Sequence, residues 1–141
     1  MKILLLFVPI LFLFACTDQQ AEIDQLEAEV IKIHDEVMPK NIEINRVRRL
    51  LKDFDRDSTL TEMEVKSLND QILELTKAEE SMNDWMVGYK APAKGDAFEK
   101  TMDYLNKEKV KITEVKRLML TSLKNGIKLL DKFSIRAEEI K

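Results

Sequence analysis

Apolar residues recur every three or four positions through three long stretches of the chain, and this spacing constrains the fold more than any other feature. The stretches cover residues 23–54, 65–89 and 98–133. Such a period places one apolar stripe along one face of an α-helix. The sequence therefore predicts helices over about residues 20–54, 59–87 and 96–133.

Three helices joined by short connections bury their stripes most simply in an antiparallel up-down-up bundle. No stretch alternates apolar and polar residues with a period of two, so the predicted fold class is all-α. Pro39 interrupts the first stripe, and an interior proline removes a hydrogen bond to the carbonyl of Asp35 at a cost of about 3 kcal/mol. We expect a kink near Met38-Pro39 and a weak point in the third helix at Gly126.

Residues 1–15 have the character of an export signal. Lys2 precedes an apolar run that is shorter than the roughly 20 residues a membrane-spanning helix needs. The stretch Leu13-Phe14-Ala15-Cys16 resembles the lipobox of bacterial lipoproteins, in which the cysteine is diacylated before cleavage, although Phe14 stands where a small residue is usual. The sequence predicts a lipid on Cys16, a polar tether over residues 16–20 and a helical domain over residues 21–141.

The alternative is an ordinary signal peptide followed by a free thiol. Cys16 is the only cysteine in the chain and falls where the apolar run ends, which favours lipidation. A lipid on Cys16 leaves no thiol for a disulfide, a thiolate metal site or a cysteine nucleophile.

Charge and composition exclude several classes of function. The chain carries 23 Lys and Arg against 26 Asp and Glu, with both signs interspersed, so it lacks the clustered basic excess of a nucleic-acid-binding protein. It has one histidine, no glycine-rich phosphate loop and no serine beside a base on a strand-to-helix turn. We therefore expect a protein that is not an enzyme and does not bind nucleic acid.

A candidate soft-metal site comes from pairing opposed positions across the two predicted turns. This pairing gathers the only histidine, His34, and the only tryptophan, Trp85, with four methionines. Met82 falls near Ile33 and His34, Met86 near Val30, Met102 beside Trp85, and Met38 one turn beyond His34. The same pairing sets Leu105 beside Met82. Thioether and imidazole ligands together suit Cu(I). Two other interpretations remain, since methionines also fill gaps in cores and could form an exposed partner surface with Trp85.

The first predicted turn resembles an EF-hand calcium loop. The six ligand positions of such a loop correspond to Asp53, Asp55, Asp57, Thr59, Thr61 and Glu64. Ser58 stands where the loop needs glycine, and an EF-hand would splay helices whose stripes favour an antiparallel pair. We therefore favour an acidic turn that caps the next helix over a Ca²⁺ site.

Two local contacts are also predicted. Thr59 followed by Glu62 has the spacing of a capping box at the start of the second helix. Lys40 and Glu79 are polar residues on apolar stripes at the same level, so they are expected to pair across the seam and to set the register of the helices.

Two segments, His34-Asp35-Glu36-Val37-Met38-Pro39-Lys40 and Ala78-Glu79-Glu80-Ser81-Met82-Asn83-Asp84-Trp85-Met86, resemble signature segments of a family of small Bacteroidota lipoproteins. Members are often labelled "viral A-type inclusion protein", a name inherited from coiled-coil similarity. The resemblance implies a helical fold and an envelope location, and it supplies no reaction.

Together these features predict a non-catalytic helical lipoprotein of the bacterial cell envelope. It would be held through Cys16 on the periplasmic side of a membrane or on the outer-membrane surface, and it would scaffold or bind an envelope protein or a second copy of itself. The alternative is a metal-handling lipoprotein that uses the His34 and methionine site for copper or the residue 53–64 loop for calcium.

Overall fold

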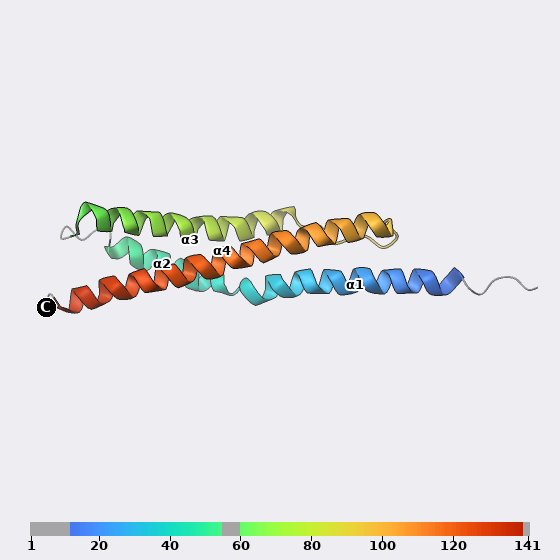
Figure 1. Ribbon diagram of the computed structural model, residues 1–141, viewed down its shortest axis with the longest axis horizontal. Coiled ribbons are helices and arrows are strands. Elements are labelled where there is room, and N and C mark those ends of the chain that lie inside the picture. Colours follow the sequence, from blue (N-terminus) through green and yellow to red (C-terminus); the bar gives the residue numbers. More distant parts are fainter. Residues whose placement is uncertain (1–11, 55–59, 140–141) are drawn as a thin grey trace, which may run out of the picture.

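The computed structural model describes residues 12–54 and 60–139. These residues form α1 (Phe12–Val37), α2 (Lys40–Phe54), α3 (Glu62–Gly88) and α4 (Phe98–Glu139), with no strand among them. α1 and α2 together make one arm, and α3 and α4 make the other two (Figure 1). The predicted all-α, up-down-up three-helix bundle is confirmed.

The predicted kink at Pro39 is confirmed as a break between α1 and α2. The Met38 amide still donates to the His34 carbonyl (2.8 Å), but Pro39 has no amide with which to continue the ladder. Two tighter bonds restart the helix: the Asn41 amide donates to the Met38 carbonyl (3.1 Å) and the Ile42 amide to the Pro39 carbonyl (3.3 Å). The chain therefore changes direction without leaving the bundle.

The arm formed by α1 and α2 runs parallel to α4, and facing residues keep nearly the same separation in sequence along it. On the α1 side of the break, Glu29 pairs with Lys109 (2.6 Å), 80 positions further along the chain. On the α2 side, the Phe54 ring packs against the Phe133 ring at 5.8 Å, at almost the same separation in sequence. α2 therefore continues along the face of α4 that α1 follows.

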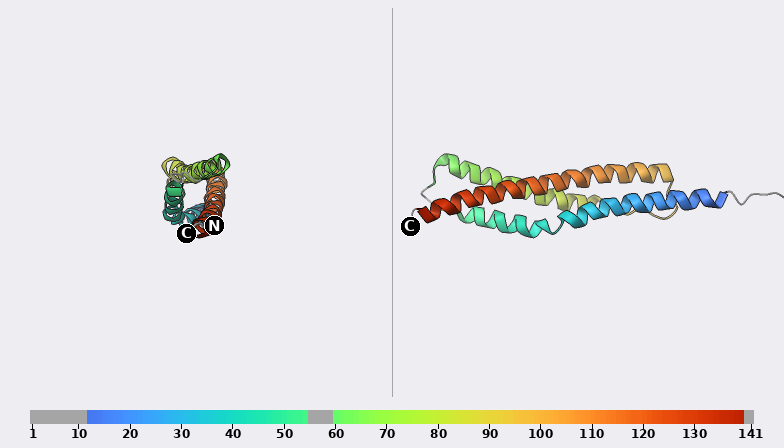
Figure 2. Two further views of the ribbon diagram at one scale, coloured as in Figure 1. Left: turned by 90° about the vertical axis from the view of Figure 1, so that its left-hand side faces the viewer. Right: turned by 60° about the horizontal axis from the view of Figure 1, so that its bottom comes forward.

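The core is divided into two clusters. The larger one includes fully buried side chains from α2, α3 and α4, such as Leu51, Leu75 and Met119. The smaller one joins Ile23 and Leu26 of α1 to Leu105 of α4. α3 ends at Gly88, so the second cluster lies beyond α3, where the connection to α4 runs alongside (Figure 2).

The predicted register between α3 and α4 was wrong. The pairing that set Met102 beside Trp85 would place Tyr89 opposite Phe98, but the Tyr89 ring stacks on Tyr104 at 6.3 Å, nearly two helical turns later. The chain leaves α3 in an extended conformation (Tyr89 φ −70°, ψ 136°), and the connection therefore runs on past the end of α3 before α4 begins. As a result Leu105 lies in the smaller cluster, apart from Met82 in the larger one.

The helix boundaries also differ from the prediction at three places. α1 is already helical at Phe12, so residues 16–20, predicted as a polar tether ahead of the first helix, lie within a helix. α3 begins at Glu62 with Thr61 as its N-cap, and α4 continues to Glu139. Within the two described ranges, no helix is both long and apolar enough to cross a membrane.

The capping box at the start of α3 lies two residues later than predicted. The Thr61 amide donates to Glu64 Oε2 (3.0 Å), and the Glu64 amide donates to Thr61 Oγ1 (3.4 Å). Both the Thr61–Glu64 pair and the predicted Thr59–Glu62 pair have the required three-residue spacing, and the helix start at Glu62 selects the former.

Gly126 lies where α4 closely approaches side chains of α2 and α3. A Cβ atom there would lie 2.9 Å from Val47 Cγ1 and 3.2 Å from Leu75 Cδ1. We expect Gly126→Ala to lower the free energy of unfolding by about 1 kcal/mol, because overpacking against the stiff Val47 side chain outweighs the gain in helix propensity. Urea unfolding would measure the change.

Gly88→Ala is the matched control, because nothing lies within 4 Å of the Cβ position there. In a Val47→Ala background, where that contact is absent, Gly126→Ala should cost less than it does in the parent. A Gly126→Ala protein more stable than the parent would show that the close approach is absent.

The ion pairs between α1 and α4 predict a loss of stability in acid. Hydrogen bonds and charge from Lys109 and Lys116 hold the pKa values of Glu29 and Glu36 below the ordinary value of 4.5. A carboxylate with a lowered folded pKa contributes stability above its unfolded pKa and loses it as the pH falls through the folded value. We expect the melting temperature to decrease as the pH is lowered below about 4.5.

The Lys109→Met and Lys116→Met double variant provides the comparison. It removes the groups that lower the two pKa values, so its melting temperature should decline less between neutral pH and acid. An equal decline in parent and variant would assign the acid sensitivity to other carboxylates.

Candidate functional site

His34 and Trp85, the only residues of their types, lie together between α1 and α3. The two rings stack with centroids 5.5 Å apart and an interplanar angle of 29°. His34 Nδ1 lies 2.9 Å from Asp35 Oδ1, so the neighbouring carboxylate orients the imidazole. The predicted position of α1 along the bundle axis, relative to α3, is therefore close to the observed one.

The methionines expected beside His34 occupy different environments. Met82 is completely buried, and Met38 and Met86 pack partly buried against the same cluster. Met102 instead packs in the smaller cluster, so the structure does not place it with the other three. Among the described residues no three His, Cys, Asp or Glu side chains form a group that could hold a metal ion. The Cu(I) site stays a prediction.

Trp85 does not form the exposed partner surface that was one interpretation of the sequence. The residue is only 7% exposed and belongs to the larger core cluster. Its ring also stacks on Tyr89 at 4.9 Å. Trp85 Nε1 is buried without a hydrogen-bond acceptor among the described residues. Trp85 is covered because the rings of His34 and Tyr89 stack on its indole.

Tyr89 and Tyr104 extend this stack to α4, so four rings from α1, α3 and α4 form one aromatic ladder. The Tyr89 hydroxyl donates to Glu27 Oε1 (3.2 Å), and the Tyr104 hydroxyl accepts from the Lys90 amide (2.8 Å). Burial, with the nearby Glu27 charge, raises the pKa of Tyr89 well above its usual range. The phenol is therefore a fixed hydrogen-bond donor that ties α1 to the end of α3.

Glu108 is a buried acid beside this ladder. It is 3% exposed and pairs with Lys111 (2.7 Å), whose pKa the hydrogen bond and charge of Glu108 raise. Glu108 and Trp85 also line a cavity of about 330 Å³ between α3 and α4. The lysine compensates the buried charge, which is the usual requirement for a buried carboxylate.

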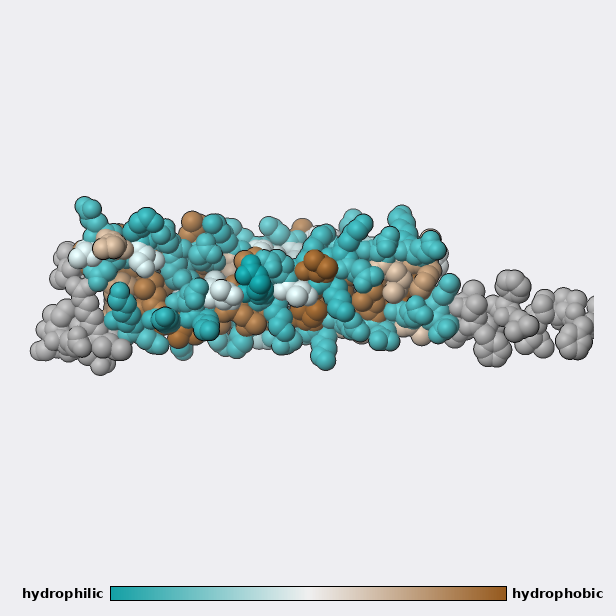
Figure 3. Space-filling view, in the orientation of Figure 1, coloured by the Kyte–Doolittle hydropathy of each residue, from teal (hydrophilic) through white to brown (hydrophobic). Residues whose placement is uncertain are grey.

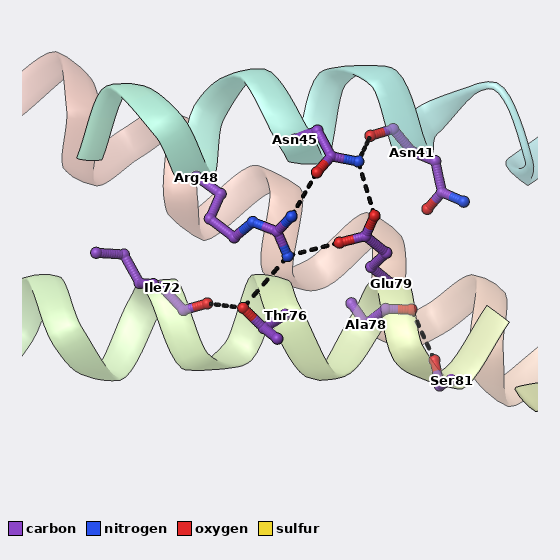
Figure 4. Close-up of polar contacts among 8 residues, drawn as sticks. All are labelled: Asn41, Asn45, Arg48, Ile72, Thr76, Ala78, Glu79 and Ser81. Carbon is purple, nitrogen blue, oxygen red and sulfur yellow. Dashed lines mark hydrogen bonds and ion pairs between the residues drawn. The ribbon is translucent and has the colours of Figure 1, made fainter. Parts of the chain in front are cut away.

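A polar network joins α2 to α3 (Figure 4). Glu79 accepts from Asn45 Nδ2 (2.9 Å) and pairs with Arg48. Arg48 also reaches Thr76 Oγ1 (3.4 Å). The predicted Lys40–Glu79 pair is wrong: Lys40 lies just after the break and pairs with Glu43 (2.8 Å), while Arg48 faces Glu79.

The EF-hand-like loop lies partly outside the described residues, because residues 55–59 are not among them, so Asp55, Asp57 and Thr59 have no described positions. Asp53 lies exposed in the last turn of α2, and Thr61 and Glu64 form the capping box of α3. Calcium binding by Glu64 would compete with that capping box. The Ca²⁺ site stays a prediction.

Cys16 lies within α1, and its side chain is outside the described part of the structure. The lipid prediction therefore depends on the sequence motif alone.

Three residues of these contacts were not predicted from the sequence: Glu108, Arg48 and Glu27. Glu108 had a signal, because it falls in the gap that the third apolar stripe leaves between Leu105 and Ile112. Arg48 and Glu27 lie at the edges of their stripes, and such positions look the same in sequence whether they face solvent or a neighbouring helix. Only the packing of the helices distinguishes the two cases.

No family model, curated protein or solved structure matches the chain. The function must therefore be inferred from its own residues and contacts.

The network between α2 and α3 predicts a large effect for Arg48. Arg48→Met leaves the Glu79 carboxylate partly buried without its counter-charge, since the two side chains are only 21% and 23% exposed. We expect a loss of about 1–3 kcal/mol in the free energy of unfolding. Chemical denaturation would measure it.

Adding Glu79→Gln to that variant should recover part of the loss, because the amide is neutral and its oxygen still accepts from Asn45. Arg117→Met is the matched control, as its pair with Glu114 is exposed and should leave stability nearly unchanged. Equal losses for Arg48→Met and Arg117→Met would contradict the assignment.

Proposed function

We propose that the protein is a non-catalytic helical lipoprotein of the bacterial cell envelope, tethered by a lipid on Cys16 and scaffolding or binding an envelope partner. The observation that carries the proposal is the lipobox-like Leu13-Phe14-Ala15-Cys16 at the end of an apolar run.

The geometry of α1 is consistent with a tether at Cys16. α1 runs unbroken from Phe12 to Val37, and its first turns extend past the start of α4 at one end of the molecule (Figure 1). α4, with 42 residues, is about 63 Å long. A lipid on Cys16 would therefore leave no flexible linker, and a rigid rod would begin directly at the membrane surface.

The use of the buried polar groups supports a non-catalytic role. Arg48 with Glu79 joins α2 to α3, and Tyr89 with Glu27 joins the end of α3 to α1. Glu108 is neutralised by Lys111 within α4. The first two contacts hold the helices together and the third compensates a buried charge, whereas a catalytic acid or base must be within reach of a substrate.

The surface supports contacts spread along the rod. The face in Figure 3 is mostly polar, with small separate apolar areas. The large apolar side chains that are exposed are distributed over α2, α3 and α4: Ile42, Leu50, Met63, Leu73, Val87, Val110, Leu120 and Ile127. Single exposed apolar residues are normal on a protein surface, so we expect a partner to bind through several charged and apolar contacts.

Lipidation is tested by expressing the full chain in a bacterium and measuring the mass of the protein recovered from the membrane fraction. The expected product begins at Cys16 and carries a diacylglyceryl group. Cys16→Ser is the matched control and should lack both the cleavage and the added mass. An unmodified Cys16 in the wild-type protein would refute the tether.

A further inference from the structure

A cavity of about 470 Å³ lies where the connection between α3 and α4 passes the first turns of α4. The polar side chains and helix positions that matter for its chemistry are Lys90, Asp96, Ala97, Lys100, Thr101 and Tyr104. Ala97, Lys100, Thr101 and Tyr104 have the spacing i, i+3, i+4 and i+7, so they share one face at the start of α4.

The first turn of α4 has no side-chain cap among the described residues. The Thr101 amide donates to the Ala97 carbonyl (3.0 Å), which makes Ala97 the N-cap, and alanine has no oxygen with which to accept from the free amides. The Asp96 carboxylate accepts from the Ala93 amide (3.1 Å) instead. The positive end of a long helix therefore lies uncapped beside the cavity.

Thr101 gives a second and independent indication of a ligand. The residue is only 5% exposed and lines the cavity, yet its hydroxyl has no hydrogen-bond partner among the described residues. Two other hydroxyl residues of α4 bond to a preceding carbonyl: Thr113 to Lys109 (2.6 Å) and Ser122 to Met119 (3.2 Å). The side chain is largely buried and its hydroxyl bonds to no group of the described chain, so a ligand oxygen in the cavity would complete its hydrogen bonding.

The charges around the cavity favour an anion. Lys90 and Lys100 have no ion-pair partner in the described part of the chain, and Asp96 is the one acid among the lining residues. Tyr104 accepts from the Lys90 amide and keeps its own proton to donate. The cavity therefore has two cations, two hydroxyl donors and an uncapped helix end. Its one acid already accepts a hydrogen bond.

We propose that this cavity binds a phosphate group. Phosphate offers more acceptor oxygens than a carboxylate and matches the number of donors, and helix N-termini with lysines are frequent phosphate sites. The phosphate could come from a phospholipid headgroup or from solution. The headgroup source rests on the proposed tether, because the cavity and the first turns of α1 lie at the same end of the molecule (Figure 1).

The first arm of the test uses inorganic phosphate and the full chain purified in mild detergent. Calorimetric titration gives the affinity, and hydrogen exchange of residues 97–104 gives the location. We expect slowed exchange at the start of α4 and a loss of affinity of about tenfold in Thr101→Val and in Lys100→Gln. Thr113→Val and Lys124→Gln are the matched controls on the same helix.

The second arm separates the two sources. The full chain is placed in nanodiscs of phosphatidylglycerol or of a phosphate-free galactolipid, and exchange of the same residues is compared. Protection in phosphatidylglycerol alone identifies a headgroup, and equal exchange in both, together with binding in the first arm, identifies free phosphate.

Three results would overturn the site. The first is no binding of phosphate in the first arm together with no protection in phosphatidylglycerol in the second. The others are equal binding of acetate and variants that bind phosphate like the parent. Because Lys100 is exposed, Lys100→Gln keeps the test valid if Thr101→Val unfolds. If the cell-derived protein has an unmodified Cys16 and still binds phosphate, the tether is refuted and the phosphate site is retained. Failure of the proposed function and failure of the phosphate site are therefore distinguishable.

Discussion

Burial of one face of α4 is the constraint on which the other elements depend, because α1, α2 and α3 all pack against this helix. Its buried stripe contributes to both core clusters, from Leu105 at one end to Phe133 at the other. Gly126 allows α2 and α3 to approach it closely in the middle. The short α2 would have little stability as an isolated helix, and packing against α4 and α3 supplies what its local propensity does not.

Polar groups in the seams fix the positions that apolar packing alone leaves open. Apolar stripes tolerate shifts of about a turn, whereas Glu79 has its charge compensated only when Arg48 lies opposite. Glu29 with Lys109, at the edge of the seam, has the same role between α1 and α4. The aromatic ladder of His34, Trp85, Tyr89 and Tyr104 then locks α1 to the end of α3, where the bundle changes from three helices to two.

Prediction from the sequence succeeded for each helix considered alone and failed where two helices had to be aligned across an irregular connection. The level of His34 against Trp85 was nearly right, whereas the Lys40–Glu79 pair predicted across the same connection was wrong. The position of Met102 was wrong, because the chain runs past the end of α3 from Tyr89 and turns back only at Lys94-Gly95, a path that sequence spacing does not reveal. The candidate phosphate site lies in that same connection.

The sequence by itself determined that the chain forms three amphipathic arms, that Pro39 breaks the first arm, and that Cys16 follows an apolar run with a lipobox-like end. These features are local, since periodicity, a missing amide and a short motif act within a few residues of chain. The tertiary structure alone decided which edge residues are buried, why Trp85 is covered, and why Thr101 meets a cavity. Those outcomes depend on the register between distant helices, which is set by the balance of packing and charge over the whole seam.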